Sequence, residues 1–508
     1  MGGRRNSWSF LDASVGESFF WSLTLSILPV VASFVVSWFI ARWTGPTVWG
    51  TVTWSMAFAT AVLIVAKMGL ELGASRLASE YGVQRPGLLR RLLRVSMKLR
   101  VAFTLPSAAI TLALAPQIAR AFREPGLIGP VRIAAAIIIC ASVYEFYEHF
   151  LIGLNRHATV SRIRAVMLSA RVVATVALVL SGGGAVAILW GYCGAWVVGI
   201  VLFGVLMVRY LPHAEPEAAE AVGLTRRLMA LSVPLAVSSA SVTVYAYIDK
   251  LMLMYFDGVE EVGQYAVARN VVEVSLFPSF AAVTMLRPAL ASRYAAGMMT
   301  ECTALIRGSL RFALAFGVLF GTLFAVLPVP LMTFVFSDSF RYAGEIMTVF
   351  VWVIVIRSLG AIVLPALVAA EKTRLYATLT MVTAGLNVVL NLVMIPRWHS
   401  RGAIVATLIS YAVLFVVGLA QTFRIFAVRV DRAGVSAGIR TVLAGGLAGL
   451  FLWFVVGQVY RRGPVPSDAS VLLWSVLLVG VYASLLLVLR VVRVDEIRSA
   501  LTNLRNRK

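Results

Sequence analysis

Apolar runs of about 18 or more residues recur along the chain from Phe19 to Leu489. As a helix rising about 1.5 Å per residue, each run can cross about 30 Å of hydrocarbon. The 508 residues are 60% hydrophobic and 13% charged, with a mean hydropathy of +0.89, whereas soluble domains are roughly half apolar and one quarter charged. Since only loops separate the runs, the sequence predicts an all-α, polytopic membrane protein without a soluble catalytic domain.

The hydropathy pattern predicts about fourteen transmembrane helices. The first is too long for a signal-peptide core and lacks a convincing cleavage site, so we expect it to be retained. The predicted spans are residues 18–42, 47–70, 99–119, 131–153, 160–181, 185–208, 228–256, 262–286, 309–336, 344–369, 375–396, 402–426, 438–459 and 470–490.

Lysine and arginine lie mostly on one side of the predicted membrane. Loops on the side of the N-terminus hold 31 of them and loops on the other side hold 9. Cytoplasmic loops carry this excess, so both termini are predicted in the cytoplasm, with the chain in the cytoplasmic (inner) membrane. Placed in this way, the net charge of +22 does not indicate nucleic acid. The stretch Gly87–Val101 reads as an amphipathic helix on anionic lipids, with a plain solvated loop as the alternative.

An internal duplication organises the chain. Residues 45–103 align on 258–316 without a gap at an offset of 213, which pairs Gly45 with Gly258 and Gly50 with Gly263. A weaker match pairs Gly184 with Gly402. Repeats in the same membrane orientation predict two pseudo-symmetric six-helix lobes around a central cavity. The predicted domains are an N-terminal lobe (1–210), a cytoplasmic linker (211–226), a C-terminal lobe (227–427) and two appended helices with a basic cytoplasmic tail (428–508).

Ionisable residues near the bilayer midplane are the first candidates for function, because each costs about 2.5 to 3.5 kcal/mol in lipid. Glu145, Arg171 and Arg357 lie at this depth, with Asn387 and Asn391 on one face at the same level. Two arginines suit a phosphate-bearing ligand, because guanidinium presents a planar fork to phosphate oxygens. A structural salt bridge between Glu145 and Arg357 is the alternative, and it is compatible with substrate binding if the bridge breaks.

A second set of charged residues suggests ion coupling or gating. Glu148 and His149 on one buried face either relay protons or form a satisfied polar cluster. Asp249 and Arg269 have matched depth across a predicted hairpin, and Arg269 is also four residues from Glu273. These pairs are structural or form an external gate.

Serines at helical spacing mark the first and seventh spans, among them Ser26, Ser33 and Ser238. They either line a cavity or provide small packing faces. The three cysteines, Cys140, Cys193 and Cys302, lack metal-ligand spacing and are expected as buried thiols. We predict neither a metal nor a cofactor, and no nucleophile constellation indicates catalysis.

Tyr247–Ala268 (YIDKLMLMYFDGVEEVGQYAVA) resembles the polysaccharide and O-antigen flippase branch of the multidrug/oligosaccharidyl-lipid/polysaccharide exporter superfamily. The features are Asp-Lys followed by a Val-Gly-x-Tyr turn, and the segment from Gly45 is similar in a degraded form. The resemblance implies a flippase that moves a lipid-linked (polyprenyl-diphosphate) oligosaccharide or polysaccharide precursor by alternating access. It also implies a monomer that works beside glycan assembly enzymes.

Two other functions remain open from the sequence. An ion-coupled multidrug exporter of the same superfamily should have an acidic cavity, but the basic residues inside the spans here match or exceed the carboxylates. A polysaccharide polymerase or ligase should have a large external loop with catalytic Arg or His, but no predicted outer loop exceeds about fifteen residues and His399 is the only histidine in them. The glycan, the carrier lipid and the coupling ion are not predicted.

Overall fold

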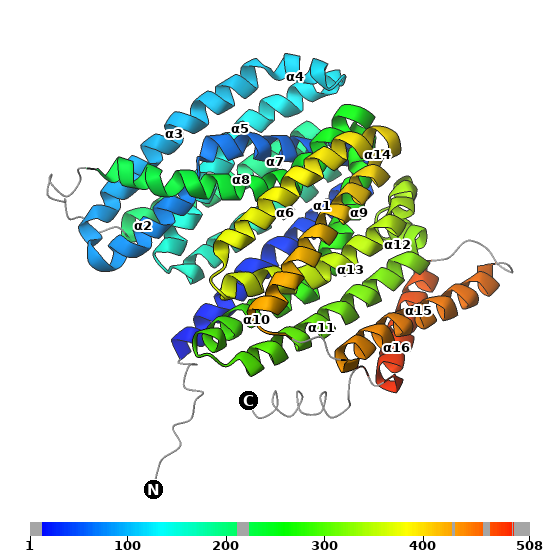
Figure 1. Cartoon of the computed structure of the whole chain (residues 1–508). Helices are drawn as coiled ribbons and strands as arrows, with labels where there is room; N and C mark the ends of the chain where they lie inside the picture. Colours follow the sequence, from blue (N-terminus) through cyan, green and yellow to red (C-terminus); the bar gives the residue numbers. More distant parts are fainter. Residues whose placement is uncertain (1–12, 211–222, 429–431, 461–467, 490, 492–508) are drawn as a thin grey trace, which may run out of the picture. The chain divides into compact units, whose positions relative to one another are not determined.

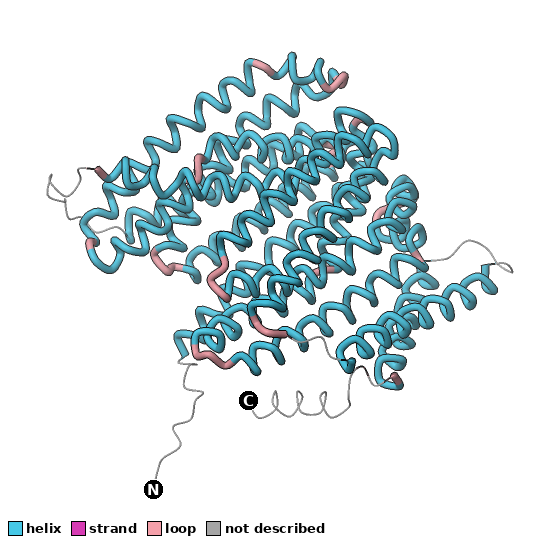
Figure 2. Tube along the Cα trace, in the orientation of Figure 1, coloured by secondary structure: helices cyan, strands magenta, loops and turns pink. Residues whose placement is uncertain are grey.

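The computed structural model describes residues 13–210, 223–428, 432–460, 468–489 and 491. Throughout these residues every regular element is a helix, and short loops join the helices (Figure 2). The prediction of an all-α fold is therefore confirmed.

The helices follow the chain as labelled in Figure 1. Their bounds are α1 Ala13–Lys67, α2 Leu70–Gln84, η1 Pro86–Leu88, α3 Leu89–Ala113, α4 Ala115–Ala121, η2 Pro125–Leu127, α5 Ile128–Gly153, α6 His157–Leu180, α7 Ala185–Tyr210, α8 Leu224–Asp257, α9 Val259–Ser275, α10 Phe277–Ala295, α11 Met299–Val326, α12 Pro328–Val335, η4 Asp338–Phe340, α13 Arg341–Ala369, α14 Thr373–Ile425, α15 Arg432–Tyr460 and α16 Asp468–Val488.

Among the described residues, 10 helices are long and apolar enough to cross a membrane, or 12 if each of two bent helix pairs is one span. Two of these, α1 and α14, have 55 and 53 residues and contain one non-helical residue each, Gly45 and His399. A Cβ atom on Gly402 would lie 2.2 Å from the carbonyl oxygen of Met394. Residues eight apart on a straight helix are about 12 Å apart, so α14 turns back after His399. The count of fourteen spans remains a prediction.

The turn at the start of each predicted repeat has the same geometry in both copies. Gly45 has φ 78° and ψ −179°, and Gly258 has φ 87° and ψ −174°, a conformation that side chains other than glycine rarely adopt. The residues that follow pack against each other reciprocally. A Cβ on Gly50 would lie 2.0 Å from the carbonyl oxygen of Val259, and a Cβ on Gly263 would lie 2.0 Å from that of Pro46. Since Pro46 aligns with Val259, each copy makes the same contact with the other.

The described residues form two compact units, which divide between Gly263 and Gln264. In unit 1, helices α2, α3, α5, α6, α7 and α8 share one apolar core that includes Phe146 and Phe150. The helix α3 covers the predicted amphipathic stretch from Leu89 onward and continues past it, with Leu89 and Leu92 buried in this core and Arg94 exposed. These residues are therefore the first part of a long packed helix, and their contact with anionic lipids stays a prediction.

In unit 2, the last two helices pack on the bundle as one layer. The residues of α15 and α16 share an apolar core with α11 and α12 that includes Leu452 and Leu478. The Tyr482 hydroxyl donates to the carbonyl oxygen of Ala315 at 2.9 Å. A Cβ on Gly445 would lie 2.3 Å from a methyl of Val318, so glycine lets α15 approach α11 closely. The predicted lobe boundaries at 210 and 227 remain predictions.

Candidate functional site

Helices α1, α5 and α6 place a group of charged side chains inside unit 1. Lys67, the last residue of α1, forms an ion pair with Glu145 on α5. One turn along α5, Glu148 forms an ion pair with Arg164 on α6. The Nδ1 of His149 lies 2.9 Å from the backbone carbonyl of Glu145 and donates to it. The two predicted carboxylates are therefore engaged by basic residues that reach them from neighbouring helices.

Arg171 on α6 belongs to the same region but has a different environment. Its Nη2 donates to the Ser33 hydroxyl of α1 at 3.3 Å, and its guanidinium lies 5.3 Å from the centre of the Tyr192 ring of α7. Its Nε is buried and has no hydrogen-bond acceptor. Within the described ranges, no carboxylate lies at ion-pair distance from Arg171. Arg171 therefore presents a buried, charged donor without an anionic partner.

Tyr144 links these groups. Arg164, Arg171 and Glu145 all lie near enough to its hydroxyl to act on it electrostatically. The ion pairs Lys67–Glu145 and Arg164–Glu148 are each neutral. Arg171 therefore gives this group of five side chains one surplus positive charge. An arginine that lacks a carboxylate favours an anionic ligand over a cationic one.

Unit 2 holds a second charged group, built by α9, α13 and α14. Arg357 on α13 donates both terminal nitrogens to Glu273 on α9, at 2.6 and 3.1 Å. Its guanidinium lies 5.0 Å from the centre of the Tyr411 ring on α14. The Nε of Arg269 is 4.0 Å from the same Glu273 carboxylate, which bears out the expected spacing of that pair. Arg357 and Arg269 therefore both contact the Glu273 carboxylate.

The other predicted site residues are placed as follows. Asn391 donates to Asn387 at 3.1 Å on α14, and both side chains are buried. The side-chain nitrogen of Asn387 and the side-chain oxygen of Asn391 have no partners. Asp249 is buried on α8 and accepts from the backbone nitrogen of Lys250 at 2.8 Å. The side chains of Ser26 and Ser238 lie outside the described part of the structure.

The suggested salt bridge between Glu145 and Arg357 is replaced by a partner for each residue within its own unit, Lys67 and Glu273 respectively. Sequence reasoning missed these partners because depth along a helix says nothing about the direction in which the side chain points. It also did not pair Arg164 with Glu148, although Arg164 lies in the second turn of α6 and reaches that carboxylate. A carboxylate at midplane depth is the only signal that a basic partner exists nearby.

Sequence reasoning also missed a fully buried arginine. Arg100 lies near the start of a predicted span, and the structure places it within α3, where it is 0% exposed. Its Nη1 is 2.6 Å from the Glu71 carboxylate of α2, and its Nε and Nη2 donate to the hydroxyl and carbonyl of Ser142 on α5. This satisfied network joins three helices and is structural.

Comparison with known proteins identifies the family. Residues 15–293, more than half of the chain, match the family described as polysaccharide biosynthesis protein. The chain belongs to the polysaccharide biosynthesis protein family. Residues 234–393 also match the MatE family. A 177-residue segment is 25% identical to the probable low-salt glycan biosynthesis flippase Agl15 of Haloferax volcanii. That match covers 35% of this chain and 38% of the relative, so the chain spans well under half of its length.

Solved structures show which fold this member of the polysaccharide biosynthesis family adopts. The lipid II flippase MurJ in an inward closed conformation is similar with a TM-score of 0.70 at 12% identity, over 92% of this chain and 97% of that one. An inward-facing MATE family multidrug resistance transporter of the MOP superfamily has a TM-score of 0.64 at 13% identity, over 78% and 94%. The chain is thus a multi-pass membrane protein with the fold of MOP transporters, and the predicted superfamily branch is confirmed.

Proposed function

We propose that this protein is a flippase for a polyprenyl-diphosphate-linked oligosaccharide or polysaccharide precursor in the cytoplasmic membrane, with alternating access as its mechanism. Family membership supports a role in polysaccharide biosynthesis. The observation that carries the substrate class is Arg171, whose buried Nε lacks an acceptor and which has no carboxylate partner among the described residues. A diphosphate supplies the acceptor oxygens that this guanidinium lacks.

Arg357 is the phosphate-binding candidate within unit 2 in this proposal. Its fork is occupied by Glu273 at 2.6 and 3.1 Å, and Arg269 already lies at 4.0 Å from that carboxylate. When a diphosphate binds to Arg357, Glu273 can keep Arg269 as its partner. Release of Arg357 therefore leaves Glu273, whose side chain is 37% exposed, beside Arg269 and partly in contact with solvent, which keeps the exchange low in energy.

A groove in unit 2 suits the lipid portion. It has a volume of about 250 Å³ and is formed by α11, α13, α14 and α15. Its apolar walls include Leu314, Leu359 and Phe415, and Arg307 and Arg311 of α11 line it as well. Leucine and phenylalanine walls suit an isoprenoid chain, and Arg307 and Arg311 add positive charge to the groove. Helix α15 supplies one wall, which gives the appended helices a role in holding the lipid.

The test is binding of a short-chain prenyl-diphosphate sugar to the purified protein. We expect Arg171→Ala to weaken binding by about 10- to 100-fold, because a hydrogen bond to a charged group contributes about 1.5 to 3 kcal/mol. Arg209→Ala is the matched control, since Arg209 is an exposed arginine near the end of α7 in the same unit. Undiminished binding by the Arg171→Ala protein would refute the assignment of the diphosphate site.

The match of residues 234–393 to the MatE family favours a second candidate, an ion-coupled multidrug exporter. The two functions differ in the charge of the cargo. A flippase variant with Arg171→Ala should lose lipid-linked sugar transport in proteoliposomes and leave drug tolerance of the host unchanged. An exporter should instead raise tolerance to cationic drugs when overproduced, and added drug should compete for the same site.

A further inference from the structure

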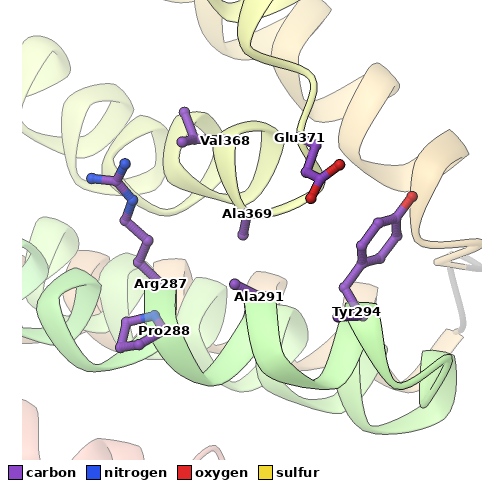
Figure 3. Close-up of a pocket in the computed structure, with 8 residues that line it drawn as sticks. Arg287, Pro288, Ala291, Tyr294, Val368, Ala369 and Glu371 are labelled. Atoms are coloured by element: carbon purple, nitrogen blue, oxygen red, sulfur yellow. The ribbon is translucent and has the colours of Figure 1, made fainter. Parts of the chain in front are cut away.

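A cleft in unit 2 lies between α10 and α13 and has a volume of about 680 Å³ (Figure 3). One wall is α10 and the other is the C-terminal end of α13. The positive-inside count assigns this end of both helices to the cytoplasmic face. The cleft is lined by Arg287, Pro288, Ala291, Tyr294, Ala295, Val368, Ala369 and Glu371.

The cleft presents one positive and one negative side chain. In Figure 3, Arg287 stands on one side, and Glu371 and Tyr294 stand on the other. Across the described residues, neither Arg287 nor Glu371 makes an ion pair or side-chain hydrogen bond. The next arginine on α10, Arg293, is by contrast held by Glu301 at 2.8 Å. Arg287 and Glu371 therefore both have free hydrogen-bonding capacity beside the same apolar floor.

The first half of the chain contains the same turn, without the acidic side chain. Glu371 has φ 59° and follows α13, and Asn155 has φ 56° and follows α5. Both turns are closed by matching bonds, from Glu371 to Val368 and from Asn155 to Ile152. The cleft beside Asn155 has a volume of about 260 Å³ and is lined by no carboxylate. The turn is thus conserved between the halves as a backbone shape, whereas the acidic side chain is specific to the second half.

The clefts of the two halves also differ in the position of the basic residue and in their width. In the first half, Arg156 is the basic residue of the cleft, and its guanidinium lies 4.8 Å from the centre of the Tyr210 ring. A Cβ on Gly153 would lie 2.3 Å from the carbonyl oxygen of Ser75, so α5 and α2 are in close contact there. The second half has Ala369 before the equivalent turn, and its helices leave the wider cleft.

We propose that the cleft between α10 and α13 binds the headgroup of an aminophospholipid from the cytoplasmic leaflet. The phosphate is bound by the guanidinium of Arg287, and the primary ammonium donates to the carboxylate of Glu371. Tyr294 lines the cleft on the same side as Glu371, and the alanine and proline floor contacts the glycerol. A headgroup without the ammonium leaves Glu371 unpaired, and a trimethylated amine offers it no N–H donor. The cleft therefore selects phosphatidylethanolamine over phosphatidylglycerol and phosphatidylcholine.

The experiment measures lipid binding to the full chain in detergent by native mass spectrometry. The three lipids carry identical acyl chains. The variants are Arg287→Gln, Glu371→Asn and Glu371→Gln, with Glu260→Gln as the control for loss of an exposed carboxylate. Asparagine already occupies the equivalent turn at position 155, so Glu371→Asn preserves the backbone and keeps the test independent of folding.

We expect the unmodified protein to bind phosphatidylethanolamine about tenfold more tightly than the other two lipids, as one charge-assisted hydrogen bond allows. Glu371→Asn and Glu371→Gln should both remove this preference, Arg287→Gln should weaken all three lipids, and Glu260→Gln should change nothing. Equal binding of the three lipids, or a preference that survives both Glu371 variants, overturns the proposal. Displacement of the lipid by equimolar soluble phosphoethanolamine also overturns it, because the ligand would then be the free zwitterion.

Discussion

Gly263→Ala tests the reciprocal contact between the two turns. The added Cβ would lie 2.0 Å from the carbonyl oxygen of Pro46, whereas ordinary contacts begin at 3.4 Å. The two backbones must therefore separate by about 1.4 Å at this point, and no flexible side chain is available to move instead. Overpacking of a close contact costs about 1 to 3 kcal/mol. Because the obstructing atom belongs to the backbone, we expect a loss of about 3 kcal/mol in the free energy of unfolding.

Gly50→Ala should cost a similar amount, since its Cβ would lie 2.0 Å from the carbonyl oxygen of Val259. One separation of the two segments relieves both clashes. The Gly50→Ala/Gly263→Ala double variant should therefore lose much less than the sum of the single losses, as expected for directly coupled sites.

The assay is reversible unfolding of the purified protein in mixed micelles, followed by circular dichroism. Gly204→Ala is the matched control, because Gly204 lies within helix α7 and its Cβ would meet no atom within 4 Å. Strictly additive losses, or a Gly263→Ala protein as stable as the Gly204→Ala protein, would refute the reciprocal contact.

Two further substitutions follow from the charged groups. Arg100→Met leaves the Glu71 carboxylate buried without its cation, so we expect a loss of about 3 to 5 kcal/mol in the free energy of unfolding. The Arg100→Met/Glu71→Met double variant should recover most of this loss. A double variant without any recovery would contradict the buried ion pair. Glu273→Gln removes the carboxylate that forms an ion pair with Arg357. Calorimetry should then show a short-chain prenyl diphosphate binding about fivefold more tightly, which corresponds to about 1 kcal/mol of binding free energy. Weaker binding would instead mean that Glu273 positions Arg357.

Much of the fold could be predicted because lipid constrains sequence more tightly than water does. Long apolar runs located the helices, and the glycine matches at an offset of 213 located a turn that recurs with the same backbone angles at Gly45 and Gly258. Such a conformation strongly favours glycine, so it leaves a trace in the sequence. The proportion of helix therefore followed from composition, and the repeated turn followed from spacing.

The candidate site could be predicted only by depth. Hydropathy places Arg171 and Arg357 within spans, but the rotation of each helix about its axis determines what the side chain contacts. Arg171 lies against Tyr192 without a carboxylate, whereas Arg357 donates to Glu273. Arg100 illustrates the same limit from the other direction. A basic residue near a span end is usually solvated, and only packing of α2, α3 and α5 around it shows that it is buried.

The reciprocal contact at Gly50 and Gly263 has the form of an isologous interface, in which one patch meets a second copy of itself. Each glycine is encoded separately on the one chain and can mutate alone. The shared close approach of the two backbones nevertheless places both positions under the same steric requirement.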